Sequence, residues 1–97
     1  MSVRAVERAF TRKLGAERDD SGDHIFFYFA REDSVYTVGK LSHSWSGDLS
    51  DTQEQMLAQK LCLQLREFRQ FVDCGLSARE MIARWFERRA GRRGGSR

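Results

Sequence analysis

Apolar residues recur at helical spacing near the start of the chain. Four of them fall on one stripe, at positions i, i+3, i+7 and i+11, and these are Val3, Val6, Phe10 and Leu14. This period places them on one face of a helix, which we expect to pack against a core. Ser2 is suited to cap the start of this helix, and Gly15 favours the left-handed conformation that ends one.

The pattern then changes to a period of two, which predicts strands. His24–Arg31 is dense in aromatic and branched residues and is the strongest strand candidate. Ala16–Asp20 predicts a weaker first strand, and Val35–Gly39 predicts a third strand, antiparallel to the second across a short polar turn. Alternation gives the second strand one purely apolar face, formed by Ile25, Phe27 and Phe29. Its other face is mixed and suits half-exposure, with His24, Phe26 and Tyr28.

Helical spacing returns after a polar loop. Ser50, with Gln53 at the capping-box position, begins a second helix. We expect a break near Cys62–Gln64, because the apolar stripe shifts there. The helical pattern then continues to Cys74, and Gly75 is expected to be the left-handed residue that ends it.

A further capping box, Ser77–Glu80, begins a last helix that we expect to end near Arg89. The predicted class is α+β, with an α-β-β-β-α core in which a three-stranded antiparallel sheet packs on helices, plus an extra C-terminal helix. The 97 residues fit a single domain, which we place at residues 1–90. Residues 91–97 are rich in Gly and Arg and predict a disordered basic tail.

Charge is unevenly distributed along the chain, whose formal net charge is +3. Residues 79–97 carry seven arginines against two glutamates, and residues 1–13 carry four basic side chains against one acidic side chain. Residues 14–78 carry six basic and eleven acidic side chains. Both ends are therefore basic and the middle is acidic. Basic residues at a chain terminus most often only keep that terminus in contact with solvent, and contact with nucleic acid is the less common role.

Several functional classes find no support in the sequence. The longest apolar run, Ile25–Ala30, is far shorter than the roughly 20 residues of a membrane span. The N-terminus lacks the apolar segment of a secretory signal. Cys62 and Cys74 lack the spacing of zinc ligands, and we expect free thiols, buried rather than reactive, in a reducing cytoplasm. No phosphate-binding loop, zinc-protease motif or nucleophile elbow is present.

Two histidines and three aromatic residues are the candidates for chemistry or binding. His24 begins the strongest strand and His43 lies in the loop before the second helix, but a lone histidine is more often structural or simply exposed. Nothing in their spacing demands a metal, so we expect no metal site. Phe26 and Tyr28 suit either base stacking or core packing. Trp45, in a polar loop, suits a partner contact.

The order of elements, with a histidine after a Gly-Asp pair at the start of the second strand, resembles the HicA toxin family. The resemblance covers residues 3–65, and residues 66–90 form a helical extension beyond the family's usual length. It rests on Lys13–Ala16 at the end of the first helix, on Gly22–Phe26 around the histidine, and on His43 with Ser44 in the loop. It implies a fold like that of double-stranded-RNA-binding domains.

The resemblance also implies an activity, because HicA toxins are ribosome-independent mRNA endoribonucleases whose strand histidine is catalytic. His24 would then be the general acid–base, acting on the nucleophile that RNA supplies in its own 2′-hydroxyl. We expect RNA contacts from Arg8, Arg12, Lys13, Lys40 and His43. The resemblance implies no cofactor, and its partners are RNA and a cognate antitoxin in the cytoplasm.

Two other functions remain open from the sequence. The first is a non-catalytic RNA-binding module on the same fold, in which the basic first and last helices follow the phosphate backbone. The second is a protein-interaction module, which the acidic middle, Trp45 and the helical extension favour and which includes a homodimer as one form. Fold alone does not decide among the three functions.

Overall fold

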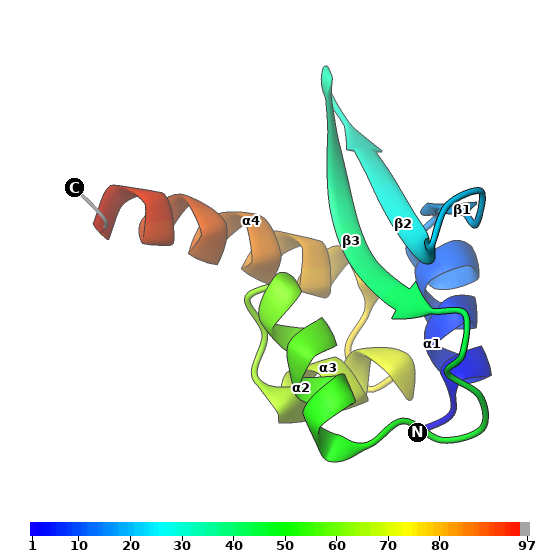
Figure 1. The fold of residues 1–97 in the computed structure, drawn as a ribbon. Coiled ribbons are helices and arrows are strands. Elements are labelled where there is room, and N and C mark those ends of the chain that lie inside the picture. The colour runs from blue at the N-terminus through cyan, green and yellow to red at the C-terminus, as the bar shows by residue number, and fades with distance from the viewer. Residues whose placement is uncertain (96–97) are drawn as a thin grey trace.

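The computed structural model describes residues 1–95, and the side chains of residues 1–91. It confirms the α+β class, with a three-stranded antiparallel sheet in the order β1-β2-β3 and helices packed against it (Figure 1). The first elements are α1 (Val3–Arg8), the π-helical turn η1 (Ala9–Lys13), β1 (Glu17–Asp19), β2 (His24–Arg31) and β3 (Ser34–Ser42). They are followed by α2 (Asp51–Lys60), α3 (Leu65–Val72) and α4 (Ala78–Gly95).

The apolar face predicted for β2 covers the core. The Phe27 ring lies 5.1 Å from the Phe10 ring of η1, which in turn lies 6.3 Å from the Phe68 ring of α3. All three side chains are fully buried. The opposite face of β2 is half-exposed, and its Phe26 and Tyr28 rings stack at 6.0 Å. The two faces of the strand therefore have the separate environments that its alternation predicts.

β3 is longer than the sequence pattern predicts, and it contains a bulge. Phe27 pairs with Gly39 but Tyr28 pairs with Thr37, so Val38 is an extra residue on β3. At this bulge Val38 and Gly39 are consecutive and both buried, which breaks the alternation of buried and exposed residues along β3. Simple alternation therefore breaks down within this strand, which explains why the pattern ends the predicted strand too early.

The helix boundaries test the capping predictions. The break near Cys62–Gln64 is confirmed, since α2 ends before it and α3 begins after it. At the end of α3 the left-handed residue is Cys74, with φ 71°, and not Gly75. The Gly75 N–H donates to the Gln70 carbonyl at 2.7 Å and closes the helix end. Cys74 is exposed in this position, so the expectation of two buried thiols is wrong; neither cysteine is in a disulfide.

α4 is the last element of the helical extension predicted at residues 66–90, which also includes most of α3. Its predicted capping box is confirmed, because the Glu80 N–H donates to Ser77 Oγ at 3.1 Å and the Ser77 N–H donates back to the Glu80 carboxylate. The helix extends past Arg89 to Gly95. Residues 96–97 of the predicted disordered tail lie outside the described residues. Among residues 1–95, no helix is both long and apolar enough to cross a membrane.

Buried carboxylates join the helices to one another. Glu67 of α3 accepts hydrogen bonds from Arg84 and from both Nη atoms of Arg88 on α4, at 2.7–2.9 Å. These hydrogen bonds, that from Arg88 above all, lower the pKa of Glu67 to about 2 despite its burial. Glu54 of α2 accepts from Arg69 of α3 at 2.8 Å in the same way. Burial alone raises the pKa of Glu54, but its hydrogen bonds outweigh burial and lower that pKa.

Candidate functional site

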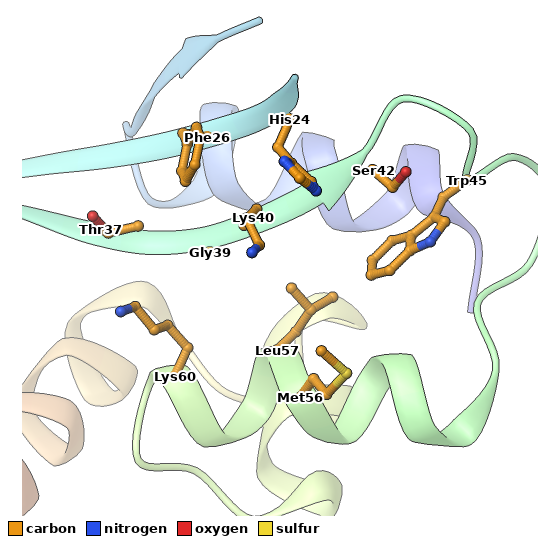
Figure 2. Close-up of a pocket in the computed structure, with 10 residues that line it drawn as sticks. All are labelled: His24, Phe26, Thr37, Gly39, Lys40, Ser42, Trp45, Met56, Leu57 and Lys60. Atoms are coloured by element: carbon orange, nitrogen blue, oxygen red, sulfur yellow. The ribbon is translucent and has the colours of Figure 1, made fainter. Parts of the chain in front are cut away.

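A concave surface lies where the free edge of β3 faces α2. Its volume is about 500 Å³. Figure 2 shows it between the strands and the helix, with the Trp45 loop closing one end. Ten residues line it, and none of them is acidic: His24, Phe26, Thr37, Gly39, Lys40, Ser42, Trp45, Met56, Leu57 and Lys60. We call this surface the His24 hollow.

His24 is the first residue of β2 and lies on its half-exposed face, opposite Ser42 of β3. The Phe26 ring meets it edge-on at 6.3 Å. Among the described residues, no group forms a hydrogen bond or ion pair with the imidazole. Both ring nitrogens are therefore available to a molecule in the hollow, either to accept or to donate a proton.

Two lysines line the same hollow as this histidine (Figure 2). Lys40 is exposed on β3, where it pairs with Phe26, and Lys60 is the last residue of α2. Neither ammonium group forms an ion pair with any described carboxylate. Their positive charges are unbalanced within the hollow, and they favour a ligand that carries negative charge at more than one point.

The remaining wall is apolar. Trp45 is partly buried and its indole faces the side of α2 that carries Met56 and Leu57 (Figure 2). Met56 is 55% exposed, so it presents apolar surface to the hollow. The backbone N–H of Trp45 donates to the Ser42 carbonyl at 3.1 Å and fixes the loop to the end of β3. A flat ring would find apolar surface here, next to the charged groups.

Gly39 allows α2 and the core to approach the strand that forms the floor of the hollow. A Cβ atom at this position would lie 3.0 Å from Phe10 Cε2 and 3.4 Å from Leu57 Cδ2. Real Cβ contacts are longer, so a larger residue would push β3 away from its neighbours. The position of β3 beside α2, and with it the shape of the hollow, depends on this glycine.

The predicted RNA-binding residues do not all gather here. The structure brings Lys40 to His24 but leaves Arg8, Arg12 and Lys13 elsewhere. These three side chains line a separate depression of about 400 Å³ with Val72 and Cys74. Lys13 Nζ donates to the Phe71 carbonyl and lies 4.9 Å from the centre of the Phe71 ring. The reason is topological, because α1 and η1 pack on the face of β2 opposite His24.

His43 is near the hollow but does not line it. Its Nε2 atom lies 3.1 Å from the Gly22 carbonyl oxygen, which is hydrogen-bond distance. This contact joins the loop after β3 to the turn that precedes His24. His43 is otherwise exposed, so its structural effect is to hold together the two segments that lead into the site.

Met56 and Lys60 line the hollow but were not among the candidates named from sequence, whereas Trp45 was expected only as a partner contact. Met56 and Lys60 are four residues apart on one exposed face of α2, and this spacing is the only signal that the sequence offers. Their approach to His24 depends on how α2 packs beside β3, which periodicity within a single element does not determine.

Within the described residues, no group of three or more His, Cys, Asp or Glu side chains is arranged to hold a metal ion. Comparison of the chain with protein families, with characterised proteins and with solved structures finds no match. The geometry of the His24 hollow is therefore the main guide to function.

Proposed function

We propose that this chain is a HicA-like, ribosome-independent mRNA endoribonuclease in which His24 is the general acid–base. The observation that carries the proposal is the His24 hollow itself, where an unpaired imidazole and two unpaired lysines line one surface and no carboxylate lines it. Such a surface suits a phosphodiester, and the apolar wall at Trp45 suits a base. The region that resembles HicA, residues 3–65, contains every residue of the hollow.

The proposed reaction is an intramolecular transesterification. His24 accepts the proton of a ribose 2′-hydroxyl, the 2′-oxygen bonds to the adjacent phosphorus, and the bond from phosphorus to the 5′-oxygen breaks. The proton then passes to that leaving oxygen, so the products are a 2′,3′-cyclic phosphate and a 5′-hydroxyl. Lys40 and Lys60 stabilise the charge that develops on the phosphoryl oxygens. A histidine whose ordinary pKa is about 6.5 is suited to both transfers near neutral pH.

The biological setting follows from the same proposal. The substrate is cellular RNA, which places the protein in the cytoplasm. The partner is a cognate antitoxin that covers the His24 hollow.

The test compares the native chain with His24→Ala and His24→Gln on single-stranded RNA in the presence of a chelator. Both variants should lose cleavage by a factor of about 100 or more, because general acid–base catalysis contributes that much. His24→Gln should still retain RNA, since the lysines remain. Circular dichroism confirms that each variant is folded. Equal cleavage by the native chain and both variants would refute the role of His24.

A non-catalytic RNA-binding module is the second candidate. One observation favours it: no described group hydrogen-bonds the His24 imidazole, so nothing in the chain itself selects a tautomer. RNA that is retained by the folded native chain but never cut, with retention that falls steeply as salt rises, would select this function.

A further inference from the structure

A second, smaller depression continues the His24 hollow toward α4. Its volume is about 250 Å³, and it shares Thr37 and Lys60 with the hollow. Its other lining residues come from β3 and α4, and again none is acidic: Val35, Tyr36, Trp85 and Arg89. Together the two depressions form one groove along the free edge of β3, which we call the β3-edge groove.

Two arginines contact aromatic rings in this region: Arg89, which lines the groove, and Arg31 of β2, which is not among its lining residues. The Arg89 guanidinium lies 4.8 Å from the centre of the Tyr36 ring. The Arg31 guanidinium lies 4.3 Å from the centre of the Phe86 ring. Those two rings meet edge-on at 4.8 Å. Neither arginine forms an ion pair with a described carboxylate, so the contact of each guanidinium with an aromatic ring leaves its charge unbalanced.

The arginines of α4 fall into two groups with different environments. Arg84 and Arg88 point to α3, where both form ion pairs with the carboxylate of Glu67. Arg89 follows Arg88 directly in the chain but contacts Tyr36 of β3 instead. The ion pairs with Glu67 hold α4 in place, and this places Arg89 beside the edge of β3. Arg89 itself has no ion pair with a described carboxylate.

We infer that α4 supplies a second RNA-binding subsite, in which Arg89 holds a phosphate of the strand whose scissile phosphate lies at His24. The inference rests on the proposed function, and it gives the helical extension a role in the same site. The groove from Ser42 to Val35 spans about 20 Å at the rise of a β-strand. Single-stranded RNA follows such grooves by pairing its phosphates with cations and its bases with aromatic rings.

Arg89→Gln tests this subsite, with Arg79→Gln as the matched control. Arg79 is exposed on the same helix and has no described ion pair, so the control removes the same charge away from the groove. Binding and cleavage are measured on an RNA of about 12 nucleotides, within the span of known single-strand sites, and on one of about three. Arg89→Gln should weaken binding of the longer RNA about five- to tenfold, as expected for one charged phosphate contact, and leave the shorter RNA unchanged.

A second variant keeps the test decisive if Arg89→Gln disturbs packing on Tyr36. Lys60→Gln removes an exposed charge that both depressions share, and it should weaken binding of both RNAs. Equal binding of the longer RNA by Arg89→Gln and Arg79→Gln, with both folded, would overturn the subsite. Failure of the proposed function gives a different result from failure of the subsite. The native chain and every variant would then leave RNA uncut, but the effect of Arg89→Gln on RNA binding could still be measured.

Discussion

At the residue scale, the site depends on one unpaired histidine and on one glycine that fixes the strand beside it. His24 could be singled out from its place at the start of a strand. Gly39 could not, because its importance comes from Phe10 and Leu57, which belong to other elements. A single sequence gives no sign of so close an approach between distant segments.

Replacement of Gly39 by Ala should destabilise the fold by about 1–3 kcal/mol, since its Cβ would overlap the Phe10 ring. Chemical denaturation measures the free energy of unfolding. Gly22→Ala is the control, because a Cβ there has no neighbour within 4 Å and should change stability by less than about 0.5 kcal/mol. Equal stabilities of the two variants would show that β3 has room to move.

At the scale of elements, local patterns predicted most of the fold. The bounds of β2, the break between α2 and α3, and the capping box of α4 all follow from residues close together in the chain. The bulge at Val38 and the left-handed Cys74 were missed, since neither residue type favours that conformation by itself. The same limit applies to Lys60, whose place in the site depends on the packing of α2.

The attachment of α4 gives a pH-dependent prediction. The pKa of Glu67 falls from 4.5 to about 2 on folding, so its ionised form stabilises the native state above pH 4.5. This contribution is lost as the pH falls from 4.5 through about 2, where the folded protein also takes up the proton. Glu67→Gln should therefore cost about 2 kcal/mol at pH 7 and progressively less across that range. Urea unfolding at several pH values measures this difference, and a difference independent of pH would contradict the account.

At the scale of the whole molecule, the acidic middle of the sequence does not produce an acidic site. The lining of the His24 hollow contains His24, Lys40 and Lys60 and no carboxylate. The buried acids Glu54 and Glu67 instead form ion pairs between helices. Net charge along the chain is thus a poor guide to charge at the groove. The α+β class could be predicted from sequence, but this sorting of charges required the tertiary structure.

The positions of the basic side chains predict how RNA binding responds to salt. Lys40→Gln and Lys60→Gln should each reduce the slope of log affinity against log salt by about 0.7, because each removes one phosphate contact with a single strand. Arg12→Gln should leave the slope unchanged, since Arg12 lines the depression on the other side of the sheet. A change in slope for Arg12→Gln alone would place the RNA at α1 and η1 instead.

The most direct test of the account is cleavage of one sequence, prepared as RNA and as DNA, by the native chain and by His24→Ala in the presence of a chelator. The account predicts that only the native chain cuts, that it cuts only RNA, and that the new ends are a 2′,3′-cyclic phosphate and a 5′-hydroxyl. Intact RNA after incubation with the folded native chain, or cleavage that survives in His24→Ala, would contradict it.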